Sequence, residues 1–280
     1  MKVYYYIHTG HRVGLDRLRR SAPVINALYD LGIEATLLTN DFRAGEYAKE
    51  QFGIRRYVSV DVVRNIANIA TPGDALIFDS REEGRAMWED MAEYFRVFVR
   101  IGDDEADRAT KESGLLCPDV VDPRYFGRFA HEGGKVYFWG DADYEKELAA
   151  LSEGFAGLGV TLLEGYYFFL QYTDELLGHF AGAADSEAYD EVLTGAGLFL
   201  TSSPQSALEA LAAGSRPVYL PRPSAEGFWR QKLARFGIPV LDFSTLEEAE
   251  KLSQAAPYRP QLLRNDAAAE VASYIKDKLS

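Results

Sequence analysis

Residues 3–39, VYYYIHTGHRVGLDRLRRSAPVINALYDLGIEATLLT, decide the fold of this chain. The stretch opens with an apolar run, passes through a loop rich in glycine and arginine, and continues as an amphipathic segment that stops at Gly32 before a second apolar run. Continuous apolar runs separated by a helix are typical of strands buried on both faces of a parallel sheet. The stretch therefore predicts a strand–helix–strand crossover with Val24–Leu31 in the helix. Pro23 fits only within a first helical turn, so we expect this helix to begin shortly before it.

The same alternation continues along the rest of the chain and predicts an α/β fold. The runs that we expect to form strands are Val3–Ile7, Ala35–Thr39, Tyr57–Val60, Ala75–Asp79, Phe95–Ile101, Val136–Trp139, Val160–Leu163, Leu198–Thr201, Pro217–Leu220 and Ile238–Phe243. We expect two Rossmann-like domains, over residues 1–132 and 133–280, that face each other across a cleft. The last helix can pack back on the first domain.

Composition excludes several classes of protein. The chain has 280 residues, 30 Lys and Arg against 43 Asp and Glu, and a net charge of −13. This balance argues against nucleic-acid binding through phosphate contacts and against a polybasic membrane-surface protein. The lone Cys117 excludes an internal disulfide framework and a Cys-x-x-Cys metal site. No transmembrane segment or signal peptide is evident, so we expect a soluble cytoplasmic protein; the oligomeric state stays open.

The loop after the first strand, residues 8–20, carries four arginines and two histidines in an otherwise acidic chain. A glycine loop, clustered arginines and the start of a helix together favour an anion site. A solvated basic loop is the alternative for any single arginine. The candidate residues in this loop are His11, Gly14, Asp16, Arg17 and Arg20.

A second candidate site follows the expected strand Leu198–Thr201, where small hydroxyl residues lie at a strand-to-helix turn. Backbone N–H groups and hydroxyls at such a turn suit a diphosphate, although an ordinary helix cap explains the serines equally well. One helical turn later, Glu209 can accept from ribose hydroxyls or favour the helix dipole. The candidates for nucleotide binding are Thr201, Ser202, Ser203, Ser206, Glu209 and, at the start of a later helix, Gln231.

Three carboxylates follow neighbouring strands of the first half: Asp79 ends one, and Asp103 and Asp104 follow the next. Carboxylates there often cap loops, but three at one sheet edge can also orient a base or a sugar hydroxyl. The motifs of serine hydrolases, zinc proteases and P-loop enzymes are missing from the sequence. We expect no metal.

Taken together, these motifs resemble GT-B-fold nucleotide-sugar enzymes, most of all the UDP-sugar hydrolases of the pseudaminic-acid pathway. Asp79 and Asp103–Asp104 fall where that family has aspartates. The stretches that resemble the family's FGGxD, GGSTxxE, NQ and GxGHxxR motifs are Phe138–Asp143, Ser203–Glu209, Arg230–Gln231 and Gly14–Arg20. Arg17 stands at the position of the family's catalytic histidine and stays protonated near neutral pH. His11 or Asp16 is then the base, while Arg17 and Arg20 neutralise the leaving diphosphate.

The resemblance implies an enzyme that transfers a glycosyl or sugar unit from a UDP-sugar to water or to an acceptor. Such an enzyme needs no cofactor beyond its UDP-sugar substrate. The alternative, from another class, is a catalytically silent nucleotide-sugar-binding or scaffold protein on the same frame. A Rossmann-type dehydrogenase is the weakest reading, because no GxGxxG motif follows a strand.

Overall fold

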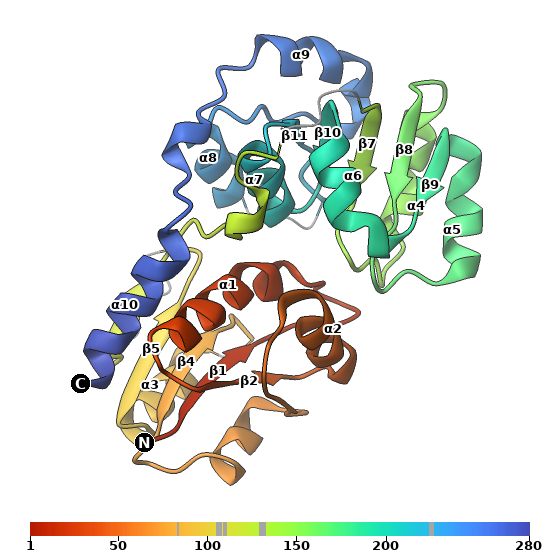
Figure 1. The fold of residues 1–280 in the computed structure, drawn as a ribbon. Helices are drawn as coiled ribbons and strands as arrows, with labels where there is room; N and C mark the ends of the chain where they lie inside the picture. The colour runs from red at the N-terminus through yellow and green to blue at the C-terminus, as the bar shows by residue number, and fades with distance from the viewer. Residues whose placement is uncertain (83, 105–107, 109–110, 129–132, 224–226) are drawn as a thin grey trace. The chain divides into compact units, whose positions relative to one another are not determined.

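The protein is described by a computed structural model that covers residues 1–280 except 83, 105–107, 109–110, 129–132 and 224–226. The chain divides into two compact units, each built around its own parallel sheet (Figure 1). The first unit comprises Met1–Gly10, Arg17–Asp122 and Asn265–Ser280, and the second comprises His11–Asp16 and Pro123–Arg264. Both are Rossmann-like α/β units, as the sequence predicts. The domain bounds at 132 and 133, and the cleft, stay predictions.

The sheet of the first unit has six strands in the order β3-β2-β1-β4-β5-β6, all parallel. The strands are β1 (Val3–Ile7), β2 (Ala35–Thr39), β3 (Tyr57–Ser59), β4 (Ala75–Asp79), β5 (Val97–Ile101) and β6 (Gly114–Leu116). The helices that accompany them are α1 (Asp16–Asp30), α2 (Phe42–Phe52), the 3₁₀ helix η1 (Val63–Asn68), α3 (Arg85–Tyr94) and α10 (Ala267–Leu279). The strand order reverses direction between β1 and β4.

The sheet of the second unit has five parallel strands in the order β11-β10-β7-β8-β9. The strands are β7 (Lys135–Phe138), β8 (Val160–Leu163), β9 (Gly182–Ala184), β10 (Leu198–Thr201) and β11 (Arg216–Tyr219). The α-helices are α4 (Glu147–Leu151), α5 (Leu170–Leu176), α6 (Tyr189–Gly195), α7 (Pro204–Ala212), α8 (Phe228–Arg235) and α9 (Ala249–Ala255). The 3₁₀ helices are η3 (Pro123–Tyr125), η4 (Ser152–Phe155), η5 (Leu177–His179), η6 (Ser186–Ala188), η7 (Phe243–Glu248) and η8 (Pro260–Leu262). Here the order reverses between β7 and β10.

Each sheet is buried by the helices that follow its strands. In the first unit, Tyr6 and Phe78 stack at 5.2 Å in a cluster that also contains side chains of η1 and α3. In the second unit, the rings of Tyr137, Phe155 and Phe180 form the centre of the core. The Tyr137 and Phe155 ring centroids are 4.5 Å apart, and those of Phe155 and Phe180 are 4.8 Å apart. The aromatic residues that are frequent in the sequence therefore supply much of both cores.

The first helix begins earlier than the sequence predicts. It starts at Asp16 and contains Pro23 in its interior, although proline removes a helical hydrogen bond. Arg17 and Arg20, in the turns before the proline, form ion pairs with carboxylates at the ends of other strands. These ion pairs hold the first turns of α1 in place, although Pro23 lacks the N–H group that would donate a helical hydrogen bond.

The weakest sequence signals lie at the edges of the sheets. The edge strands β6 and β9 were not among the predicted strands, because Gly114–Leu116 and Gly182–Ala184 are short and contain glycine and alanine. The predicted strand Ile238–Phe243 is wrong as a strand, since it makes a single bridge, from Val240 to Tyr219.

The last helix, α10, belongs to the first unit. Tyr274 of this helix packs against Gly114 of β6 so closely that a Cβ atom at Gly114 would lie 2.0 Å from the tyrosine hydroxyl. The glycine therefore allows the helix to cover that edge of the sheet.

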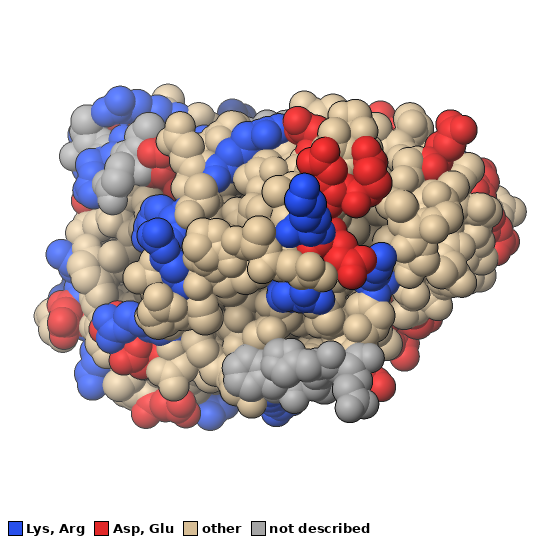
Figure 2. Space-filling model, turned by 90° about the horizontal axis from the view of Figure 1, so that it is seen from above, with Lys and Arg blue, Asp and Glu red and all other residues tan. Residues whose placement is uncertain are grey.

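On the face drawn in Figure 2, acidic and basic side chains lie next to one another in several places, with uncharged areas between them. In the part of the chain that the structure describes, no helix combines the length and the apolar character that a membrane span needs. Within the same residues, no group of three or more His, Cys, Asp or Glu side chains is arranged to hold a metal ion. The cytoplasmic location stays a prediction.

Candidate functional site

In open parallel sheets, ligands bind beyond the carboxyl ends of the strands where the strand order reverses. In the first unit these strands are β1 and β4, which pair with each other along their full length. His8 follows β1 directly, and Asp79 is the last residue of β4 with Glu82 three residues later. The residues around this point form the candidate site of the first unit.

Four of the predicted site residues form one ion-pair network in the first unit. Asp79 accepts from Arg17 Nη1 at 2.6 Å and from Arg20 Nε at 2.9 Å, and Arg20 Nη2 forms a further short contact with it. Asp103 accepts from Arg17 Nη2 at 3.1 Å and also pairs with Arg20. The structure thus brings together two arginines and two aspartates that lie far apart in the sequence.

The network is buried, and this limits its chemistry. The Asp79 side chain has no exposed surface and that of Arg20 is 7 % exposed, whereas that of Arg17 is 21 % exposed. Burial alone would lower the pKa of Arg20, but Asp103 and Asp79 outweigh it and raise that pKa well above its ordinary value. Asp79 therefore positions the arginines and is not placed to take a proton from a substrate. Arg17 is the member open to a ligand.

His8, which was not among the predicted site residues, has the environment of a general base. Its Nε2 lies 3.9 Å from Glu82 Oε1, and each of the two side chains is 26 % exposed. The hydroxyl of Tyr6 donates to Glu82 Oε2 at 2.6 Å and so fixes the carboxylate. Burial lowers the pKa of His8; Glu82 opposes this and Arg17 reinforces it. The imidazole is therefore neutral near pH 7 and able to accept a proton.

In the second unit the corresponding strands are β7 and β10. The turn after β7 contains Gly140 at a φ of 122°, a conformation that favours glycine. Arg222 Nη2 donates to the Trp139 carbonyl at 2.7 Å, and its Nη1 donates to the Ala142 carbonyl at 3.2 Å. A Cβ atom at position 140 would lie 2.2 Å from Arg222 Nη2. Arg222, which sequence reasoning missed, thus closes the turn that resembles FGGxD.

The hydroxyl turn after β10 is a helix cap. Ser203 is the N-cap of α7, and its Oγ accepts from the Ser206 N–H at 3.0 Å. Thr201 Oγ1 accepts from the Ser203 N–H at 3.0 Å, and Ser202 Oγ lies 2.9 Å from the Tyr137 hydroxyl. These side chains are buried and order the start of α7.

Glu209 lies in the same helix with no exposed surface. Its Oε2 accepts from the Tyr189 hydroxyl at 2.6 Å, and its Oε1 accepts from Gln205 Nε2 at 3.0 Å. The Tyr189 hydroxyl is also 2.6 Å from Ser206 Oγ. The carboxylate therefore supports the turn from inside, and the predicted contact of Glu209 with a ribose stays a prediction.

The segment His11–Asp16 is part of the second unit. The Leu15 N–H donates to Asp141 at 3.2 Å, and Asp16 Oδ1 accepts from Ser203 Oγ at 2.7 Å. Gly14 has a φ of 81° and lies against the backbone of residues 141 and 142. His11 is exposed, with its ring 5.2 Å from that of Tyr144. Of the two predicted bases, Asp16 is engaged at the start of α7 and His11 has no carboxylate partner in the described part of the chain.

Two predicted residues remain. Gln231 is exposed on α8, and Asp104 is half-buried in the loop after β5. The roles that we assigned to these residues stay predictions.

Several solved structures share this fold at low sequence identity. No protein-family model and no curated protein matches the sequence. A calicheamicin glycosyltransferase is 14 % identical with a TM-score of 0.61, over 100 % of this chain and 98 % of that one. The UDP complex of MnaA from S. aureus is 12 % identical with a TM-score of 0.61, over 100 % and 97 %. The UDP-GlcNAc 2-epimerase from Methanocaldococcus jannaschii is 10 % identical with a TM-score of 0.59, over 99 % and 100 %. The fold is therefore that of GT-B glycosyltransferase structures with Rossmann-like domains.

Proposed function

We propose that this protein is a nucleotide-sugar-dependent enzyme that transfers a glycosyl unit from a UDP-sugar to water or to an acceptor hydroxyl. The observation that carries the proposal is the position of His8, whose Nε2 lies 3.9 Å from Glu82 Oε1 at the strand reversal of the first unit. A neutral imidazole beside a fixed carboxylate is suited to remove a proton from water or from an alcohol. Hydrolysis of a UDP-sugar, as in the family that the sequence resembles, is the narrower form of the proposal.

In this reaction His8 takes the proton of the attacking hydroxyl while its oxygen forms a bond to the anomeric carbon. The bond from that carbon to the diphosphate oxygen breaks, and UDP leaves with the electron pair. Glu82 stabilises the imidazolium that forms. Arg17, held in place by Asp79 and Asp103, offers its exposed edge to the negative charge of the leaving group.

The second unit would bind the nucleotide. The S. aureus structure that shares this fold contains UDP, and one from Neisseria meningitidis contains UDP-GlcNAc. In the present chain the start of α7 is the predicted place for the diphosphate, because the dipole of a helix favours an anion at its N-terminus. Ser203, Ser206 and Glu209 keep that turn ordered. Gln231 is the predicted contact that is exposed to solvent.

Calorimetric titration with UDP, GDP, CDP, TDP and NAD tests the binding part. We expect UDP to bind and the Gln231→Ala variant to bind it several-fold more weakly. Gln254→Ala, an exposed glutamine on α9 of the same unit, is the matched control and should bind like the wild type. If none of the nucleotides binds, the proposal is wrong in both its forms.

Turnover is measured as UDP released from UDP-sugars, with and without a panel of acceptor alcohols. We expect His8→Gln to lower kcat at least 100-fold, in line with the size of general base catalysis of about 10²–10⁴. His11→Gln, which changes the other histidine of the same loop, should retain turnover. Equal rates in both variants would show that His8 is not the base.

A nucleotide-sugar-binding protein without turnover is the second candidate. It is favoured by the mutual pairing of Arg17, Arg20 and Asp79, three residues that the resemblance places in the chemistry. This candidate is supported if the protein binds UDP but releases no UDP from any sugar conjugate under the same acceptor panel.

A further inference from the structure

A separate cavity of about 460 Å³ lies in the first unit, at the amino ends of its strands. The residues that line it include Lys2, Tyr4, Thr36, Arg56, Val58 and Ile69. None of them takes part in the proposed reaction. His8 follows the other end of β1, which is five residues long, so the two places are about 16 Å apart at a rise of about 3.3 Å per residue.

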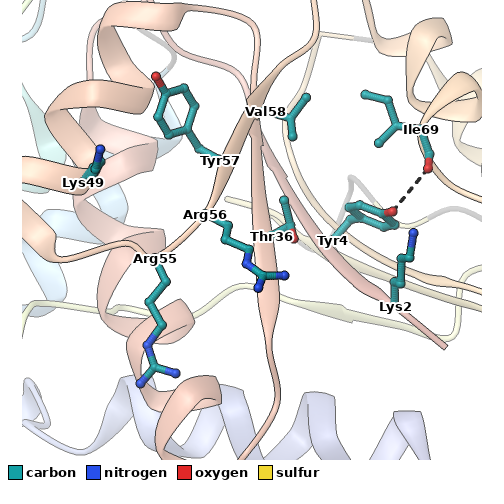
Figure 3. A pocket seen from close by; sticks show the side chains of 9 residues that line it. All are labelled: Lys2, Tyr4, Thr36, Lys49, Arg55, Arg56, Tyr57, Val58 and Ile69. Carbon is teal, nitrogen blue, oxygen red and sulfur yellow. Dashed lines mark hydrogen bonds between the residues drawn. The ribbon is translucent and has the colours of Figure 1, made fainter.

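The sheet register gathers the polar side chains of this cavity. Tyr4 of β1 pairs with Thr36 of β2. Next to Thr36, the Leu37 N–H donates to the Arg56 carbonyl at 3.0 Å, at the start of β3. Because side chains alternate along a strand, Lys2 lies on the same face as Tyr4. Figure 3 shows Arg56, Thr36, Tyr4 and Lys2 following one another across the strands.

The cavity exists because η1 covers only part of this face. The Tyr4 hydroxyl donates to the Ile69 carbonyl at 3.2 Å, just after the end of η1. Further along the strands, Tyr6 and Leu38 are buried in the core cluster. At the amino ends the face is open, and Val58 is 37 % exposed. The floor of the cavity is therefore apolar, and polar side chains lie beside it.

Two exposed cations line this cavity, Lys2 and Arg56. Among the described residues, neither side chain forms an ion pair within 4 Å. The Lys2 backbone N–H donates to Asp74 Oδ1 at 2.7 Å, and the Lys2 charge acts on that carboxylate at longer range. Arg55 differs, since it pairs with Glu34 at 2.7 Å and lies 4.3 Å above the Tyr29 ring. Figure 3 shows it turned away from Thr36. In a chain with a net charge of −13, two such cations beside a hydroxyl indicate a site for an anion.

We propose that this cavity binds a small phosphate monoester whose organic part is apolar or aromatic. Arg56, Lys2 and the Thr36 hydroxyl would donate to the phosphate oxygens, and guanidinium groups suit phosphate geometry. Val58, Ile69 and the Tyr4 ring would contact the organic part. The volume lies within the range of about 300–1,000 Å³ that small-molecule sites occupy.

Calorimetric titration of the full chain with phenyl phosphate tests this site. We expect one saturable site that binds phenyl phosphate more tightly than inorganic phosphate, phenol or benzoate. Arg56→Gln should weaken binding at least 10-fold, the usual scale for a lost hydrogen bond to a charged group of about 1.5–3 kcal/mol. Arg96→Gln, an exposed arginine elsewhere in the first unit, is the matched control and should leave it unchanged.

Three results would overturn the proposal: no saturable heat with phenyl phosphate, equal affinity in Arg56→Gln, or benzoate bound as tightly as phenyl phosphate. A titration in the presence of excess UDP distinguishes this cavity from the nucleotide site of the proposed function. Phenyl phosphate should bind equally well with UDP present, whereas competition would assign it to the nucleotide site and refute the second site. If UDP does not bind, the proposed function is wrong, but the measured binding of phenyl phosphate still tests the cavity.

Discussion

Asp79 is the more deeply buried of the two aspartates that pair with Arg17 and Arg20. It has no exposed surface and contacts two guanidinium groups from α1. A buried charge is stable only while its partners remain, so removal of one member leaves the others uncompensated.

We therefore expect Asp79→Asn to lower the free energy of unfolding by about 3–5 kcal/mol, the usual cost of a broken buried ion pair. Glu34→Gln is the control, because it breaks a pair with Arg55 in which the side chains are 61 % and 53 % exposed. That change should cost less than about 1 kcal/mol. Urea denaturation of both variants measures the difference, and equal losses would contradict the burial argument.

The lowered pKa of His8 predicts a pH dependence. Burial favours its neutral form in the folded chain, so the unfolded chain binds more protons between the folded pKa and the ordinary value of about 6.5. Stability from this residue is therefore present above pH 6.5 and is lost as the pH falls towards the folded pKa. Between pH 7.5 and 5.5 the Tm of the wild type should fall further than that of His8→Gln. A parallel fall would argue against the lowered pKa.

At the scale of residues, the sequence named Arg17, Arg20, Asp79 and Asp103 as candidates near the carboxyl ends of strands. It did not predict that they pair with one another. Whether the arginines face a ligand or the aspartates depends on distances that composition and spacing do not contain. His8 was missed because the carboxylate near it, Glu82, belongs to a different segment of the sequence. Only folding brings the two side chains together.

At the scale of elements, the contact between α2 and β3 depends on one glycine. A Cβ atom at Gly45 would lie 2.3 Å from the ring of Tyr57. Alanine is the better helix former by about 1 kcal/mol, but overpacking costs about 1–3 kcal/mol. The two effects oppose each other, and the clash should be the larger one.

Gly45→Ala should therefore destabilise the protein by up to about 2 kcal/mol net. In a Tyr57→Ala background the same change should be neutral or stabilising, because the ring is absent. Denaturation of the four proteins of this double-mutant cycle measures the coupling, and its absence would show that α2 moves freely away from β3.

Elements with strong patterns were predicted well, and those with weak patterns were not. The strands Val3–Ile7, Ala35–Thr39 and Ala75–Asp79 have the predicted bounds, because central parallel strands are apolar throughout. The edge strand Gly182–Ala184 has no bulky residue to mark it. Its place is decided by pairing with β8, a long-range contact that local sequence does not contain.

At the scale of the molecule, the chain returns to the first unit with α10 after it has built the second. Deletion of residues 267–280 should expose the edge of the first sheet that Tyr274 covers. Hydrogen exchange measured by mass spectrometry should then accelerate in β5 and β6 and stay unchanged in β8 and β9. Uniformly faster exchange would instead indicate that the two units unfold as one.

The three-part make-up of the first unit also has a consequence for synthesis on the ribosome. The first unit needs Asn265–Ser280, which are translated after every residue of the second unit. The second unit can therefore reach its final form while the nascent chain is still being extended. The first unit is therefore completed after the second, and until then the edge of its sheet at β6 stays uncovered by α10.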